Sequence, residues 1–105
     1  MNKEHHIESR DFWVKIIEML QQNWALIENN VDQTVTVYFI TDTSKIFDQM
    51  NFSSKKEAKK GLRRNGFIRY DEDPSFKRFI KTPEPPFVPY RDDTRNIYSS
   101  GKFWR

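Results

Sequence analysis

The apolar positions follow two different periods along the chain, and these periods predict the order of its elements. Within residues 10–22, apolar side chains recur with the spacing i, i+1, i+4, i+5 and i+8, which is typical of one face of an amphipathic helix. They are Phe12, Trp13, Ile16, Ile17 and Leu20. Ser9 precedes this stretch as a candidate N-cap. A helix over residues 10–22 is therefore predicted.

Three strands are predicted after this helix. Residues 24–28 form a short apolar run, residues 34–41 are β-branched and aromatic, and residues 45–52 alternate in character. The short connections between them favour an antiparallel meander. Residues 67–70 predict a brief fourth strand.

The sequence leaves open whether the second face of this sheet is covered. Tyr38, Ile40 and Phe47 are predicted to point to that face. An uncovered apolar face would serve as a docking surface or as the interface of a homodimer.

A second helix is predicted over residues 54–65. Ser54 and Glu57 have the S-x-x-E spacing of a capping box, and Gly66 follows where a left-handed residue would end the helix. Farther along the chain, Asp73 and Pro74 form an N-cap and N1 pair that predicts a further helical turn.

These elements predict an α+β fold in the order α-β-β-β-α, followed by a short helical turn. We expect a small antiparallel sheet of three to four strands with the helices 10–22 and 54–65 on one face. Residues 1–8 are expected to be a flexible N-terminus, residues 9–81 a single domain, and residues 82–105 an extended Pro-rich C-terminal arm.

The C-terminal arm combines prolines with aromatic residues. Its prolines disfavour regular structure and favour an extended conformation; they are Pro83, Pro85, Pro86 and Pro89. A disordered tail is usually poor in aromatic residues, but this arm contains Phe87, Tyr90, Tyr98, Phe103 and Trp104. Two interpretations stay open: the arm packs its rings against the domain, or it is an adhesive segment that binds a partner.

Charge is distributed unevenly along the chain. Residues 1–54 contain four Lys or Arg and eight Asp or Glu, a formal charge of −4, whereas residues 55–69 contain seven Lys or Arg and one Glu, a formal +6. On a helical wheel, six cations cover about half of the circumference of the helix 54–65. They are Lys55, Lys56, Lys59, Lys60, Arg63 and Arg64.

This basic helix face is the candidate binding site. An acidic protein surface or nucleic acid are the partners that such a face would bind. The charge could also be neutralised internally by the acidic N-terminal half, or by a second copy of the chain, or remain a solvated surface.

The order helix, three strands and helix resembles that of the double-stranded RNA-binding domain, and residues 54–59 resemble the start of its second helix. The resemblance implies that Lys55, Lys56 and Lys59 would contact phosphates across a major groove. This chain departs from the family in the loop at residues 29–33, which lacks a Gly-Pro pair, and in the absence of a Gly-rich run before Ser54.

Few residues suggest catalysis or metal binding. The two histidines, His5 and His6, are adjacent and near the N-terminus, which does not provide a tetrahedral site. The acidic run at residues 71–73 lacks the ligand spacing and central Gly of a calcium loop. We expect no cofactor, no metal and no enzymatic activity.

The remaining sequence features bear on the environment of the protein. The chain has no cysteine, which is consistent with a reducing compartment, and no apolar stretch of the length that spans a membrane. The sequence therefore predicts a non-catalytic cytoplasmic binding module that acts in protein–protein interaction. Its alternative is a nucleic-acid-binding domain that contacts phosphates through the helix 54–65.

Overall fold

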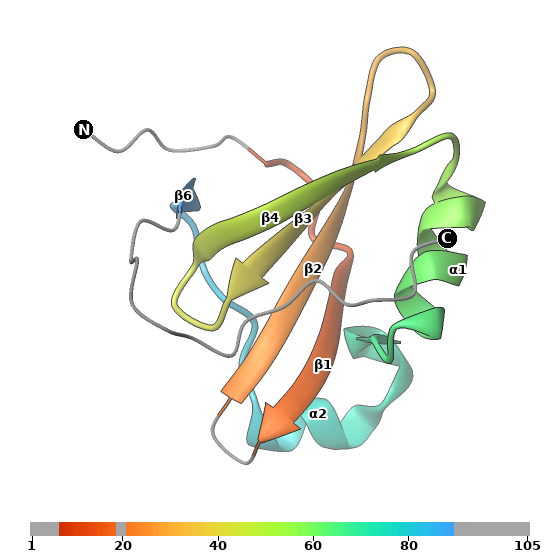
Figure 1. Ribbon diagram of the computed structural model, residues 1–105. Helices are drawn as coiled ribbons and strands as arrows, with labels where there is room; N and C mark the ends of the chain where they lie inside the picture. Colours follow the sequence, from red (N-terminus) through yellow and green to blue (C-terminus); the bar gives the residue numbers. More distant parts are fainter. Residues whose placement is uncertain (1–6, 19–20, 90–105) are drawn as a thin grey trace.

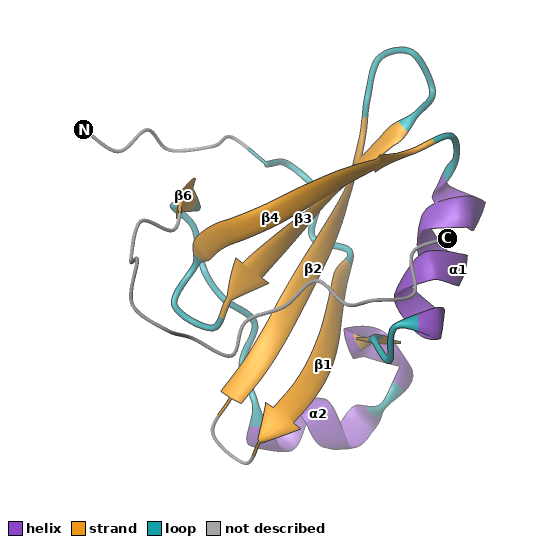
Figure 2. Ribbon diagram, viewed as in Figure 1, coloured by secondary structure: helices purple, strands orange, loops and turns teal. Residues whose placement is uncertain are grey.

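A computed structural model of the protein describes residues 7–18 and 21–89, and within them the chain begins with strands (Figure 1). The sheet has six strands in the order β5-β1-β2-β3-β4-β6. All neighbouring strands are antiparallel except β4 and β6, which are parallel (Figure 2). The strands are β1 (Phe12–Glu18), β2 (Gln21–Asn29), β3 (Val35–Thr41), β4 (Lys45–Phe52), β5 (Ile68–Arg69) and β6 (Val88–Pro89). The helices are α1 (Lys55–Arg64), the 3-10 turn η1 (Tyr70–Glu72) and α2 (Pro74–Phe79).

The predicted fold class is wrong in its first element and in its sheet. Residues 10–22 do not form a helix: β1 and the start of β2 occupy this stretch. The sheet is mixed and six-stranded rather than antiparallel with three to four strands. The topology α-β-β-β-α is therefore replaced by an order in which four strands precede the first helix.

The sequence pattern of β1 was misleading because residues 12–14 of this strand are buried on both faces of the sheet. Phe12 and Val14 pack into one core cluster, whereas Trp13 packs into the other. When both faces of a strand are covered, adjacent residues are apolar and the alternation that marks a half-exposed strand is lost. The aromatic and β-branched residues of this stretch are typical of strands.

The two faces of the sheet carry two separate cores. On the face covered by α1, the helix-side core comprises Trp13, Ala25, Ile27, Val35, Val37, Phe39, Ala58, Leu62 and Phe67. On the opposite face, the far-side core comprises Ile7, Phe12, Val14, Trp24, Leu26, Ile40, Ile46 and Phe87. Phe76 and Ile80, which lie in and directly after α2, pack against the far-side core. The prediction that the helices 10–22 and 54–65 share one face is also wrong, because residues 12–18 form β1.

The second face of the sheet is covered. Ile40 is fully buried, and Tyr38 packs against the far-side core. Phe47 lies on the other side, because a register shift between Phe39 and Ile40 inserts it into β4 as a bulged residue, and its ring lies 6.3 Å from that of Phe39. The uncovered apolar face that suggested a homodimer is therefore absent at these residues, and the oligomeric state stays a prediction.

The elements after β1 agree more closely with the sequence. β4 coincides with its predicted strand, the ends of β2 and β3 lie within three residues of the predicted ends, and residues 68–69 supply the brief further strand. The helix predicted over residues 54–65 is confirmed as α1: Ser54 caps it by accepting a hydrogen bond from the backbone N–H of Glu57 at 3.2 Å. Gly66 follows in the left-handed conformation, with φ of 89°. The predicted helical turn is α2, with Asp73 as its N-cap.

The first residues of the Pro-rich arm are part of this fold. Val88 and Pro89 pair with the start of β4, and the backbone N–H of Val88 donates to the Ser44 carbonyl at 3.2 Å. Phe87 is 1% exposed in the far-side core, with the guanidinium of Arg10 5.7 Å from its ring centroid. Rings of the arm at Tyr90 and beyond lie outside the described residues, as does most of the predicted flexible segment 1–8.

Candidate functional site

The cationic face of α1 points outward because the opposite side of the helix is packed on the sheet. Ala58, Gly61 and Leu62 are buried, and Asn65 is 3% exposed and donates from its side chain to the Gly61 carbonyl at 2.9 Å. Two of these residues are small, so the helix backbone lies close to the sheet. Its tertiary packing stabilises α1 even though its i,i+4 cation pairs repel one another.

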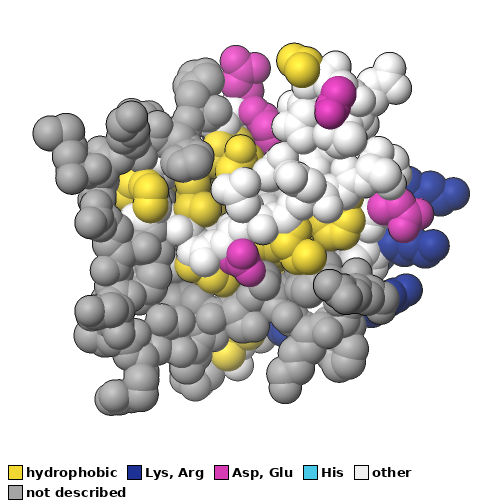
Figure 3. Space-filling view, turned by 45° about the horizontal axis from the view of Figure 1, so that its top comes forward, with side chains coloured by type: hydrophobic (Ala, Val, Ile, Leu, Met, Phe, Trp, Pro, Cys, Tyr) yellow, Lys and Arg dark blue, Asp and Glu magenta, His cyan; other side chains and the backbone are white. Residues whose placement is uncertain are grey.

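Four lysines of α1 form what we call the lysine face: Lys55, Lys56, Lys59 and Lys60. Lys55, Lys56 and Lys60 are exposed and Lys59 is half-buried. Within residues 7–18 and 21–89, none of the four forms an ion pair or a hydrogen bond through its ammonium group. In the space-filling view, Lys and Arg side chains gather at one margin of the molecule (Figure 3). These ammonium groups are therefore available to an anionic partner.

The arginines of the predicted site differ from its lysines. The Nη2 atom of Arg63 lies 2.7 Å from Oε1 of Glu72, and its guanidinium carbon lies 5.0 Å from the ring centroid of Trp13. Arg63 thereby connects the end of α1 to η1 and to the helix-side core. Arg64 is exposed but is not without a partner. The structure therefore divides the six predicted residues into four lysines without a carboxylate partner in the described chain and two arginines with other contacts.

The hairpin loop between β2 and β3 lies at the end of the molecule where α1 begins (Figure 1). Its apolar residue, Val31, is fully exposed. Val31 was not among the predicted site residues, although a single valine between Asn30 and Asp32, in an otherwise polar connection, was visible as a signal. The loop is thus a second candidate element of the site.

A polar hollow of about 270 Å³ connects the base of this loop with the lysine face. Lys55 lines it together with Glu8, Ser9, Ile27, Glu28 and Asn29. The Glu28 carboxylate accepts hydrogen bonds from the backbone N–H groups of Glu8, at 3.1 Å, and Ser9, at 2.9 Å. This carboxylate lies nearby but forms no ion pair with Lys55.

The pKa of Asp32 provides a test of order in the loop. The hydroxyl of Thr34 and then its backbone N–H donate to the Asp32 carboxylate, at 2.6 and 3.1 Å, and hold its pKa below the usual value of 3.8. Because the pKa of Asp32 is lower in the folded protein than in the unfolded chain, the ionised carboxylate stabilises the fold. This stabilisation is complete above the pKa of the unfolded chain and is lost as the pH falls through the pKa of the folded protein. We expect an NMR titration of the Asp32 carboxyl carbon to give a midpoint below 3.8.

Replacing Thr34 by Val is the matched control for this titration, since it removes the hydroxyl donor and keeps the backbone donor. The Asp32 midpoint should then move up toward 3.8. A midpoint that is already at 3.8 in the unmodified protein would show that the loop does not hold this geometry in solution.

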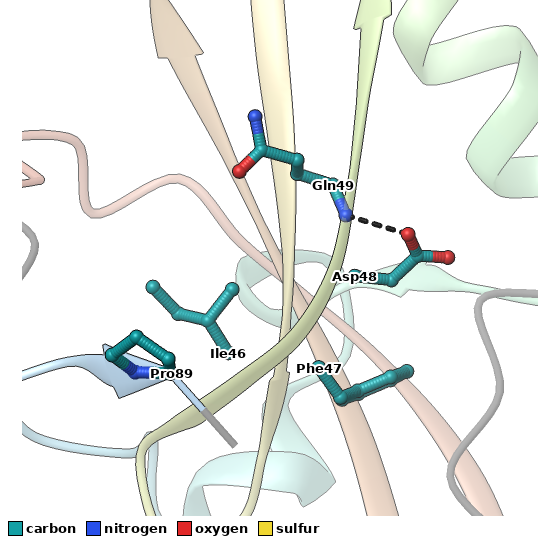
Figure 4. A pocket seen from close by; sticks show the side chains of 5 residues that line it. All are labelled: Ile46, Phe47, Asp48, Gln49 and Pro89. Atoms are coloured by element: carbon teal, nitrogen blue, oxygen red, sulfur yellow. Dashed lines mark hydrogen bonds between the residues drawn. The ribbon is translucent and has the colours of Figure 1, made fainter. Parts of the chain in front are cut away.

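Another hollow, of about 290 Å³, lies at the bulge of β4 (Figure 4). Ile46, Phe47, Asp48, Gln49 and Pro89 line it. The backbone N–H of Gln49 donates to Oδ1 of Asp48 at 2.8 Å, whereas the Gln49 side chain points away from this carboxylate (Figure 4). These side chains do not converge on a common point, so the hollow presents no catalytic or metal-binding arrangement.

The described residues contain no group of three or more His, Cys, Asp or Glu that could hold a metal ion. The acidic run at residues 71–73 is engaged locally, since Asp71 pairs with Lys77 at 3.4 Å and Asp73 caps α2. His5 and His6 lie outside the described residues.

No helix among residues 7–18 and 21–89 has the length and apolar character needed to cross a bilayer.

Comparisons of the chain with protein families, with curated proteins and with solved structures found no match.

Proposed function

We propose that this protein is a non-catalytic cytoplasmic binding module whose lysine face docks on an acidic surface of a partner protein. One observation carries the proposal: the described fold supplies Arg63 with a carboxylate at 2.7 Å but supplies none to the four lysines beside it. Like charges held together on one face cost stability. An external anionic surface would remove that cost.

The surroundings of the lysine face favour a protein over nucleic acid. Glu57 lies on the same helix, and Glu8 and Glu28 line the hollow beside Lys55. An extended phosphate backbone would run past these carboxylates and be repelled, whereas the acidic side chains of a protein can be confined to the lysines. Arg63, whose guanidinium fork suits phosphate oxygens best, is held by Glu72.

The nucleic-acid alternative was based partly on a resemblance to the double-stranded RNA-binding domain, and the N-terminal part of the structure does not support that resemblance. That resemblance needs a helix before the three strands, and the chain has β1 there. The remaining support for this resemblance is the position of Lys55, Lys56 and Lys59 on the outward face of α1. Nucleic-acid binding is therefore treated as the other outcome of the test below.

The lysine-face variant, in which the exposed Lys55, Lys56 and Lys60 are replaced by Gln, should weaken binding of polyglutamate at least about tenfold at low salt. Each lysine contributes a charge–charge attraction of about 1 kcal/mol at contact distance in water, and tenfold corresponds to about 1.4 kcal/mol. The melting temperature should change little, because the three side chains are exposed and have no ion pair in the described structure. Fluorescence anisotropy against a salt series measures the binding.

The matched control replaces Lys77, Arg78 and Lys81 by Gln, which removes the same number of charges from exposed positions in and after α2. This control variant should keep nearly all of the polyglutamate binding. Equal losses in the two variants would show that net charge, rather than the lysine face, is responsible. Tighter binding of a duplex RNA than of polyglutamate, abolished by the lysine-face variant alone, would contradict a protein partner and support the nucleic-acid alternative.

A further inference from the structure

The loop between β2 and β3 places an apolar side chain in full contact with water. Val31 is 105% exposed, more than any other large apolar residue in the described chain. The next are Phe79 at 80%, Ile16 at 47% and Ile68 at 43%. Single exposed apolar residues are common, so exposure alone does not indicate a binding role for Val31. The argument for such a role depends on the hydrogen bonds that order the loop and on the nearby lysine face.

Hydrogen bonds hold the loop in one conformation. The backbone N–H of Asn30 donates to the Thr34 carbonyl at 2.9 Å, and its side-chain amide donates to the hydroxyls of Thr34 and Thr36, each at 3.0 Å. Asp32 accepts from Thr34 twice, and Gln33 adopts the left-handed conformation with φ of 73°. The tip is therefore pre-organised, and presenting Val31 to a partner would require little additional ordering.

The loop and the lysine face lie at the same end of the sheet. Val35, the first residue after the loop, pairs with Phe52, and α1 begins three residues after Phe52 at Lys55. Asn29, the last residue of β2, lines one hollow together with Lys55. The base of the loop and the start of the cationic helix thus line one hollow, and Val31 lies two residues beyond Asn29 at the tip of the loop.

We propose that the loop tip and the lysine face form one composite docking surface, which fits an acidic segment of a partner protein with apolar side chains interspersed among its carboxylates. Val31 is the apolar anchor of this surface, and the lysines are its charged rim. Protein interfaces combine these parts, because the buried apolar contact supplies affinity and the surrounding charges supply orientation and rate of encounter. This inference rests on the proposed function and names its partner more closely.

The two parts of the surface should respond differently to salt. Apolar contact at Val31 does not depend on counterions, whereas attraction by the lysines is screened as salt increases. A random copolymer of glutamate and tyrosine and a polyglutamate of equal charge are therefore suitable probes. The native protein should bind the copolymer more tightly, and this advantage should persist at high salt.

Replacing Val31 by Ser tests the anchor. The variant should bind the glutamate–tyrosine copolymer about tenfold more weakly, which corresponds to burial of most of one valine side chain. Its binding to polyglutamate and the salt dependence of that binding should be unchanged. The melting temperature should also be unchanged, since Val31 has no buried surface to lose.

Phe79→Ser is the matched control, because Phe79 is also an exposed apolar residue but lies at the end of α2. It should leave copolymer binding intact. If Val31→Ser retains the copolymer advantage while the lysine-face variant loses polyglutamate binding, the composite surface is overturned and the proposed function stands. If the lysine-face variant retains binding, the proposed function fails and this inference fails with it. Weaker binding of duplex RNA by Val31→Ser, without an effect on the copolymer, would overturn the acidic-segment partner.

Discussion

Phe87→Ala is expected to lower the free energy of unfolding by about 3–5 kcal/mol, the range for truncating a buried phenylalanine. Phe87 is 1% exposed and packs into the far-side core with Ile7, Phe12 and Ile46. Its removal leaves a cavity in that core and removes one of the contacts that hold the Pro-rich segment beside β4. Urea denaturation followed by tryptophan fluorescence measures this loss, and Trp24 in the same core is a suitable probe.

Phe87→Leu is the matched control, because it keeps an apolar side chain in the cavity. Its cost should be well below that of the alanine variant. A loss of less than about 1 kcal/mol for Phe87→Ala, typical of an exposed substitution, would show that residues 82–89 do not dock on the sheet in solution. The first part of the arm would then be a free segment, as one interpretation of the sequence allowed.

Trp13→Ala should also cost about 3–5 kcal/mol, the range for truncating a buried tryptophan. Trp13 is fully buried in the helix-side core, and the guanidinium of Arg63 lies 5.0 Å from its ring centroid. The substitution therefore removes packing between β1 and α1 together with a cation–π contact. Thermal unfolding followed by circular dichroism measures the effect.

Two controls separate the contribution of the packing of Trp13 from that of its contact with Arg63. Trp13→Phe keeps an aromatic ring and should be far less destabilising than the alanine variant. Arg63→Gln removes the cation and its exposed ion pair with Glu72, and exposed pairs contribute about 0–1 kcal/mol. If Arg63→Gln were as destabilising as Trp13→Ala, the connection from α1 to η1, rather than the packing of Trp13, would dominate this side of the fold.

The contacts of Arg63 also show that the cations of α1 differ in their surroundings, although they share one helix face. On the helical wheel, Arg63 and Lys59 are neighbours with the same formal charge. Arg63 lies on the last turn of α1, where η1 brings Glu72 within 2.7 Å. No described carboxylate pairs with the lysines nearer the start of α1. The available charge is therefore concentrated toward the end of the molecule that carries the β2–β3 loop.

The candidate site was partly visible in the sequence. The cations of residues 55–64 and their grouping on one helix face follow from helical periodicity alone. The sequence could not predict that Arg63 is paired within the fold whereas the lysines are not. The difference depends on the ion pair between Arg63 and Glu72, which are brought together by the turn after α1. Val31 was visible only as one apolar residue in a polar loop, and its proposed role rests on its exposure and on the hydrogen bonding of that loop.

By itself, the sequence determined the elements whose signals are local. Ser54 and Gly66 define the ends of α1, Asp73 and Pro74 define the start of α2, and β-branched residues define β3. Only the tertiary structure decided what residues 12–18 become, because an apolar stripe fits a helix and also a strand buried on both faces. The burial of Phe87 in the far-side core was likewise decided by the tertiary structure. A residue joins a core through partners distant in the sequence, and local sequence patterns carry no information about those partners.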